Sequence, residues 1–222
     1  MLSAEEALRT RRSVRAFLPK PVPRETIEGI LGLAARAPSG SNIQPWQVIV
    51  LTGAPLRRLG EELSRLALAG HSEPREFHYY PRAWREPYLT RRRKVGWDLY
   101  ASLGITRGDK ERMAAQRARN FIFFGAPVGL LFTLDRDMEI GSWIDLGMFL
   151  QSIMIAARAF GLDTCPQVSF AQFPQTIGAR LDIPKDRMLV CGLALGYRDP
   201  DAPENTFPTM REEVASFTRF IP

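Results

Sequence analysis

The sequence has few of the residues that build metal centres and disulfide frameworks. Its 222 residues include two cysteines and two histidines. Cys165 and Cys191 cannot form a disulfide framework, and no Cys-x-x-Cys pair occurs. His71 and His78 are too few for a histidine-rich metal site, and they leave little for a serine–histidine–aspartate relay. We therefore expect neither a metal ligand set nor a fold held by disulfides.

Long hydrophobic runs are also absent. The longest uncharged run, 37–56, is interrupted by three prolines and carries Ser, Asn and Gln. The most apolar run, 121–134, has 14 residues and contains Gly125 and Pro127. Neither run is typical of a membrane span. The first six residues are acidic and lack the apolar segment of a secretory signal. We expect a soluble, cytoplasmic protein with no membrane partner.

The charge balance is basic, with 30 Lys and Arg against 24 Asp and Glu, a net charge of +6. Basic proteins suit nucleic acids, membrane surfaces or phosphorylated small molecules. Arginines gather at residues 9–15 and again at 91–94. Neither group comes with a homeodomain, zinc-finger or RNP pattern, so we expect no nucleic-acid partner. The run 91–94 is typical of a solvated helix face, and a nucleic-acid-binding protein is the alternative that it leaves open.

Apolar periodicity predicts helices and buried strands in alternation. An α/β or α+β single domain over residues 1–222, with a sheet covered by helices, follows from this order. The run 46–51 predicts a strand buried on both faces. Gly161 predicts a left-handed cap at the end of the helix 142–160. The segment 161–167 predicts a turn. The predicted elements are helices at 23–37, 56–69, 109–120 and 142–160, with strands at 46–51, 127–134 and 188–196.

The stretch 70–109 differs from the rest in composition. It is rich in charged and aromatic residues and is interrupted by three prolines. A long segment of this kind is more typical of a lid than of a core. Trp84 and Tyr88 lie within it, and either ring could stack on an aromatic substrate.

Two segments carry groups suited to a phosphorylated, planar ligand. The sequence has neither a P-loop nor a Rossmann fingerprint. Arg11-Arg12-Ser13-Val14-Arg15 offers guanidinium groups and a hydroxyl, which bind phosphate well. The loop 38–46, Pro-Ser-Gly-Ser-Asn-Ile-Gln-Pro-Trp, places hydroxyls and amides before a predicted strand, where they can face a polar ring.

With these two segments, Gly161 to Gln167, Gly196-Tyr197 and Arg211, the sequence resembles the FMN-dependent nitroreductase family over nearly its whole length. In detail it is similar to the subgroup that acts on nitroaromatics such as nitrobenzoates. The resemblance implies an α+β, three-layer fold with a mixed, mainly antiparallel sheet flanked by helices. It also implies an interlocked homodimer with two FMN molecules at the subunit interface.

The resemblance implies a role for each matching residue. Arg11, Ser13 and Arg211 would hold the FMN phosphate, Arg12 the ribityl-phosphate, and Arg15 would lie beside N1 and O2 of the flavin ring. Where a better-known branch of the family has Pro-Ile-Glu-Gly, this sequence has Pro-Gln-Val-Ser at 166–169. This difference would keep a backbone contact to N5 of the flavin, but it would not allow a role for a carboxylate. The other implied FMN contacts are Pro38, Ser39, Gly40, Ser41, Asn42, Gln44, Pro166, Gln167, Val168 and Ser169.

The expected activity is hydride transfer from NADH or NADPH, through FMN, to a nitroaromatic or quinone-like acceptor by a ping-pong mechanism. The flavin carries the chemistry, so no catalytic acid–base residue is expected. A reductive dehalogenase or a flavin-fragmenting enzyme of the same fold is the alternative.

Overall fold

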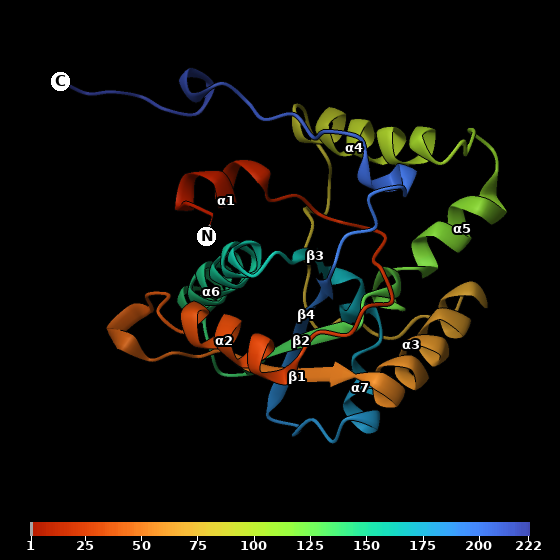
Figure 1. Ribbon diagram of the computed structural model, residues 1–222, viewed down its shortest axis with the longest axis horizontal. Helices are drawn as coiled ribbons and strands as arrows, with labels where there is room; N and C mark the ends of the chain where they lie inside the picture. Colours follow the sequence, from red (N-terminus) through yellow and green to blue (C-terminus); the bar gives the residue numbers. More distant parts are fainter. Residues whose placement is uncertain (1) are drawn as a thin grey trace.

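A single antiparallel sheet forms the centre of the computed structural model, which describes residues 2–222. Its four strands run in the order β1-β2-β4-β3, and each neighbouring pair is antiparallel (Figure 1). A parallel bridge between Ser13 and Thr164 adds the N-terminal segment beside β3. The strands are β1 (Gln47–Thr52), β2 (Val128–Asp135), β3 (Asp163–Gln167) and β4 (Arg187–Gly196).

Helices cover both faces of this sheet, which gives three layers (Figure 1). Successive residues of β2 point to opposite faces. Leu130 and Phe132 pack with α2 and α6, whereas Leu131 packs with α3 and α7. The helices are α1 (Ala4–Thr10), α2 (Arg24–Ala34), α3 (Gly53–Leu68), α4 (Tyr88–Ser102), α5 (Lys110–Ala118), α6 (Ile140–Ala159) and α7 (Pro174–Arg180).

The central helix α6 ends where the sequence predicts. Gly161 has a φ of +70°, the left-handed conformation that glycine adopts without a Cβ penalty. The N–H of Gly161 donates to Arg158 O at 3.0 Å, and the N–H of Leu162 donates to Ala157 O at 2.9 Å. These two bonds form a Schellman cap, which satisfies the last carbonyl groups of the helix and turns the chain into β3.

By length and composition, α6 could also cross a membrane, with a mean hydropathy of 1.4 over 18 residues. Leu146, Phe149 and Ile153 on this helix are buried in the core formed with α2 and the sheet. Core helices of soluble proteins have the same composition, so the hydropathy of α6 is weak evidence for a membrane span.

Two strand predictions are wrong. The strand β1 lies at the edge of the sheet, and Val50 is 41% exposed, so β1 is not buried on both faces within one chain. The segment predicted as a turn contains β3, which pairs with β4. A strand of five residues that includes Pro166 has too little apolar alternation to be recognised from sequence.

Candidate functional site

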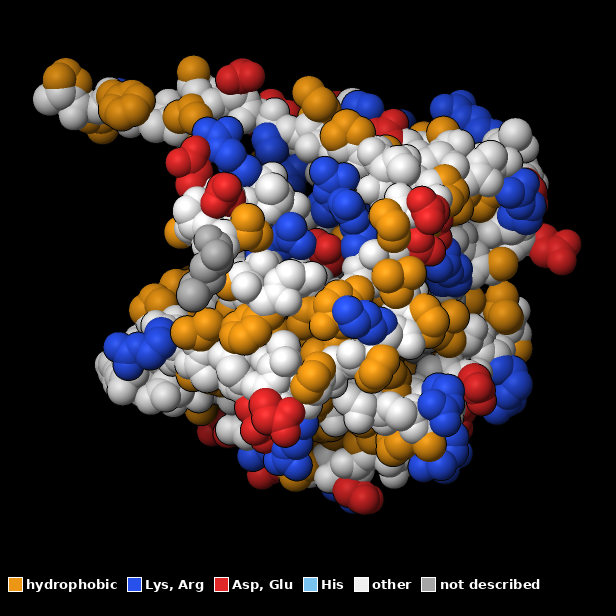
Figure 2. Space-filling view, in the orientation of Figure 1, with side chains coloured by type: hydrophobic (Ala, Val, Ile, Leu, Met, Phe, Trp, Pro, Cys, Tyr) orange, Lys and Arg blue, Asp and Glu red, His pale blue; other side chains and the backbone are white. Residues whose placement is uncertain are grey.

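A polar cavity of about 740 Å³ lies between the end of α1, the segment that follows it, α4 and the C-terminal segment. Basic side chains gather in the hollow under the extended C-terminal tail (Figure 2). The residues that give the cavity its polar character are Arg9, Arg11, Arg12, Ser13, Arg15, Gln151, Glu204, Asn205, Thr209 and Arg211.

The arginine-rich segment reaches this cavity because it is extended. The N–H of Val14 donates to Thr164 O at 3.0 Å, and the N–H of Leu18 donates to Tyr197 O at 2.8 Å. Side chains of an extended chain alternate between two sides. Val14 and Ala16 are buried in the protein. Arg11, Ser13 and Arg15 therefore point to the opposite side, where they line the cavity.

The cavity carries positive charge without a matching carboxylate. Across residues 2–222, Arg11, Arg12, Arg15 and Arg211 form no ion pair with Asp or Glu. Glu204 also lines the cavity, but its carboxylate pairs with Arg119. Burial lowers the pKa of Arg11, and the nearby positive charge of Arg211 lowers it further. Since like charges held together repel, this arrangement favours binding of an anion.

The residues predicted to bind the phosphate thus lie together at this cavity. The loop 38–45 lies in another part of the molecule. In Figure 1 this loop follows α2 at the left of the molecule, away from the C-terminal segment. Three of its residues, Ser41, Asn42 and Gln44, have positive φ values. Non-glycine residues in that region are strained, and such strain concentrates at functional sites. Ser39 accepts a hydrogen bond from the N–H of Gln44 at 3.0 Å, which stabilises the turn.

The predicted contacts at 166–169 are placed beside the arginine segment through the Ser13–Thr164 bridge. The side chain of Gln167 is buried and donates to Asn120 O at 2.6 Å. Its amide is therefore turned into the protein, and only its backbone remains for a ligand. Pro166 is exposed, and Val168 and Ser169 are half-buried at the start of a helical turn.

Two aromatic residues of the predicted lid, Tyr88 and Trp84, lie against arginines. The guanidinium carbons of Arg85 and Arg91 lie 4.8 Å and 5.9 Å from the ring centre of Tyr88. Arg92 lies 4.9 Å from the ring centre of Trp84. Tyr88 and Val95 are seven residues apart on α4, so they share a helix face, and Val95 lines the polar cavity.

Sequence reasoning missed three buried polar residues that support these segments: Asp145, Glu204 and Asn205. Asp145 bonds to the N–H of Gly40, Glu204 pairs with Arg119, and Asn205 bonds to the backbone at Arg15. Their partners lie far away in the chain. No local pattern in the sequence marks them.

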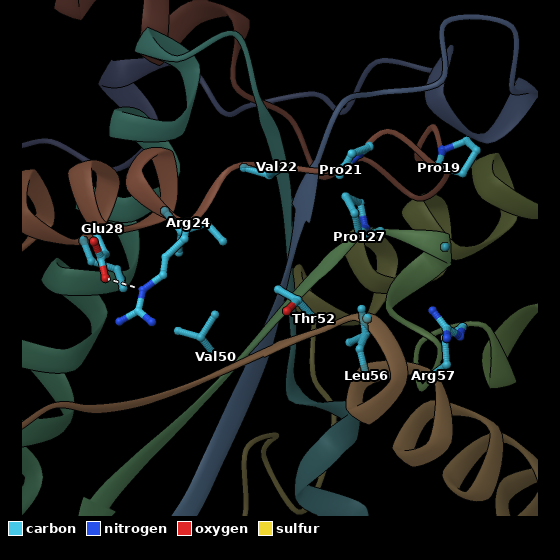
Figure 3. A pocket seen from close by; sticks show the side chains of 15 residues that line it. Pro19, Pro21, Val22, Arg24, Glu28, Val50, Thr52, Leu56, Arg57 and Pro127 are labelled. Atoms are coloured by element: carbon cyan, nitrogen blue, oxygen red, sulfur yellow. Dashed lines mark hydrogen bonds and ion pairs between the residues drawn. The ribbon is translucent and has the colours of Figure 1, made fainter.

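A second, larger cavity of about 980 Å³ is mainly apolar and includes none of the predicted site residues. It lies between the proline-rich segment before α2, the edge strand β1 and Pro127 (Figure 3). Val22, Val50 and Leu56 point into it, and Arg24 pairs with Glu28 at 2.7 Å beside it. Its apolar lining suits a hydrophobic segment rather than a phosphorylated ligand.

Comparison with known proteins gives consistent matches. The nitroreductase family model matches residues 8–197. The 4-nitrobenzoate reductase of Pseudomonas putida is 42% identical over 214 residues, covering 96% of this chain and 92% of that protein. The nitrobenzene nitroreductase of Ectopseudomonas oleovorans is 40% identical over 220 residues, covering 98% and 96%. The crystal structure of the FMN and NADPH-dependent nitroreductase NfnB from Sphigopyxis sp. strain HMH matches with a TM-score of 0.96 and 41% identity, covering 100% of both chains.

Proposed function

Because this chain belongs to the nitroreductase family, we propose that it is an FMN-dependent oxidoreductase that takes hydride from NADPH or NADH and reduces nitroaromatic or quinone-like acceptors by a ping-pong mechanism. The predicted family and its α+β fold are confirmed by the same comparisons. The observation that carries the proposal is the cluster of four arginines at one polar cavity, which have no carboxylate partner among residues 2–222.

The residues of this cavity fit the phosphate end of FMN. A phosphate dianion would relieve the repulsion between Arg11 and Arg211, since Arg is suited to bidentate phosphate binding. The Ser13 hydroxyl would add a donor, and Arg12 would reach the ribityl-phosphate. When bound, the flavin supplies the hydride chemistry, accepting two electrons from the nicotinamide and releasing them to the acceptor.

Arg15 would act on the flavin ring rather than on the phosphate. Its guanidinium lines the cavity, and its Nη1 donates to Ser13 O at 3.3 Å. A fixed cation beside N1 and O2 stabilises the negative charge of the reduced ring. The backbone at 166–169, next to this segment, would approach N5.

We propose that the site is completed by a second copy of the chain in a homodimer. The loop containing Pro38, Ser39, Gly40, Ser41, Asn42 and Gln44 lies away from the C-terminal segment that lines the arginine cavity of the same chain (Figure 1). If this loop and the arginine segment 11–15 contact the same FMN, the two come from different subunits.

The C-terminal tail supports an interlocked form of this dimer. It extends away from the body of the chain (Figure 1). Five of its apolar residues have exposed fractions between 60% and 85%. Exposed apolar side chains do not stabilise an isolated chain, and a group of them indicates an interaction surface. In the part of the chain that the structure describes, one edge of β1 pairs with no strand. This edge and the apolar cavity of Figure 3 can accept the tail of the second copy as an added strand. The exposed apolar residues are Met210, Val214, Phe217, Phe220 and Ile221.

The segment 70–109 would form the lid over the acceptor, with Trp84 and Tyr88 stacking on an aromatic ring. The relatives that cover 96% and 98% of the chain are named as a 4-nitrobenzoate reductase and a nitrobenzene nitroreductase. These names favour nitroaromatic reduction over dehalogenation or flavin fragmentation. Location in the cytoplasm stays a prediction.

The purified protein tests the proposal directly. We expect flavin absorption bands, release of FMN on denaturation, and oxidation of NADPH or NADH that depends on added 4-nitrobenzoate. Nitrobenzene and a quinone serve as further acceptors. A colourless protein that binds no added FMN, or a flavoprotein that transfers no electrons to any of these acceptors, would contradict the proposal.

A further inference from the structure

The side-chain amide of Asn205 links the arginine segment to the chain at Asp199. Asn205 is 5% exposed, in a short helical turn at Pro203–Asn205. Its Oδ1 accepts from the N–H of Arg15 at 2.8 Å, across 190 positions in the sequence. Its Nδ2 donates to Ala16 O and to Asp199 O, both at 2.9 Å. A buried amide with all of these bonds made resists displacement, because breaking any of them leaves a buried polar group without a partner.

The turn that carries Asn205 is itself fixed on both sides. Glu204, also 5% exposed, forms an ion pair with Arg119 at the end of α5. The backbone oxygen of Asn205 accepts from Nη1 of Arg12 at 3.3 Å. Asn205 therefore connects Arg12 and Arg15 to the body of the protein through one turn.

The backbone hydrogen bonds on either side of Arg15 do not hold Arg15 itself, so Asn205 fixes its position. The extended segment is held at Val14 by β3 and at Leu18 by Tyr197. Between these points, the N–H of Arg15 is bonded by the Asn205 side chain. A shift of the Arg15 backbone would move its guanidinium within the cavity, and the interaction between a cation and a nearby charge depends steeply on their separation.

We propose that Asn205 is a positioning residue for the flavin, acting through Arg15 and Arg12. The inference rests on the proposed function, since it assumes that FMN binds in the arginine cavity. Asn205 does not contact the reacting atoms in this scheme. It fixes where the positive charge lies beside the flavin ring and the ribityl-phosphate.

The test is the variant Asn205→Ala, loaded with FMN, beside the parent protein. We expect the Kd for FMN to rise about tenfold, as for the loss of a hydrogen-bonded arrangement around a charged group. The midpoint potential of the bound flavin should fall, because Arg15 is no longer held where it stabilises the reduced ring. A purely structural role would lower the unfolding midpoint of the apoprotein and leave the potential unchanged.

Thr206→Ala is the matched control. Thr206 follows Asn205, is exposed, and its hydroxyl donates to Pro203 O at 2.7 Å, within the same turn. We expect the parent values of both Kd and potential for this variant. If Asn205→Ala does not fold, Asn205→Gln takes its place: it keeps a neutral amide one methylene further out, so a change in potential reports position and not charge.

The outcomes separate the two proposals. If the parent protein binds no FMN, the proposed function fails. If the parent binds FMN and the folded Asn205 variant has the same Kd and potential, the role of Asn205 is refuted and the function stands. A loss of affinity with an unchanged potential would also refute it, since Arg15 would not have moved.

Discussion

The carboxylate of Asp145, on α6, accepts hydrogen bonds from the backbone N–H of Gly40, at 3.3 Å to Oδ1 and 3.2 Å to Oδ2. Asp145 is 6% exposed, whereas the loop around Gly40 lies at the surface. A helix of the core thus holds the start of a loop in which three non-glycine residues adopt positive φ values. This contact offsets part of the strain in that loop.

Asp145→Ala should lower the free energy of unfolding of the apoprotein by about 1–3 kcal/mol, because Gly40 loses the acceptor for its N–H. Asp145→Asn keeps an acceptor oxygen and should lose less. Urea unfolding, followed by circular dichroism, measures both. Equal losses in the two variants would show that the hydrogen bond to Gly40 contributes little.

FMN affinity should depend on Arg11 and Arg211. Each charge-assisted contact to phosphate is worth about 1.5–3 kcal/mol, so Arg11→Gln or Arg211→Gln should weaken FMN binding by roughly 10- to 150-fold. Riboflavin lacks the phosphate and should bind the variants and the parent alike. Titrations followed by flavin fluorescence measure both ligands.

Arg9→Gln is the control for these variants, since Arg9 lines the same cavity but pairs with Glu5 at 2.8 Å on the exposed side of α1. It should change the FMN affinity far less. Equal losses of FMN and riboflavin in the Arg11 variant would refute its role at the phosphate.

Arg15 should tune the flavin potential more than its affinity. Removing a cation beside the reduced ring destabilises the anion, so Arg15→Gln should lower the midpoint potential by about 20–65 mV. Reduction by the nicotinamide should slow accordingly. Spectroelectrochemical titration of the fully loaded variant checks this value, and an unchanged potential would leave Arg15 a structural arginine.

The lid residues should affect the acceptor and not the flavin. Trp84→Ala and Tyr88→Ala should change KM among nitroaromatic acceptors, because the rings stack on aromatic substrates, while FMN retention stays at the parent level. Tyr79→Ala is the control, since Tyr79 is exposed and packs edge-on against Tyr80. Release of flavin from the Tyr88 variant would assign the lid to the cofactor site.

The C-terminal tail should be required for the dimer. Removing residues 213–222 takes away four of the five exposed apolar side chains of the tail and leaves Arg211 in place. We expect the truncated chain to dissociate in sedimentation experiments at micromolar concentration, and the parent to remain a dimer, as for interfaces above roughly 2,000 Å². A parent protein that is an FMN-loaded monomer would refute the dimer itself.

Features that rest on local patterns can be predicted from the amino-acid sequence alone. The spacing of Ile27, Ile30 and Ala34 marks the buried face of α2, and Gly161 marks the end of α6, because helix periodicity and left-handed caps depend on neighbouring residues. The arginine segment was visible for the same reason: its charged groups lie within five positions of each other.

Which distant segments contact one another depends on the packing of the whole fold. The apolar run of β1 does not reveal an edge strand, because apolar and β-branched residues favour a strand at the edge of a sheet as well as at its centre. The side chain of Gln167 turns to Asn120, and Asn205 reaches Arg15 across most of the chain. Such pairings are set by how the layers pack, and a hydrogen bond between distant residues leaves no periodic trace in the sequence.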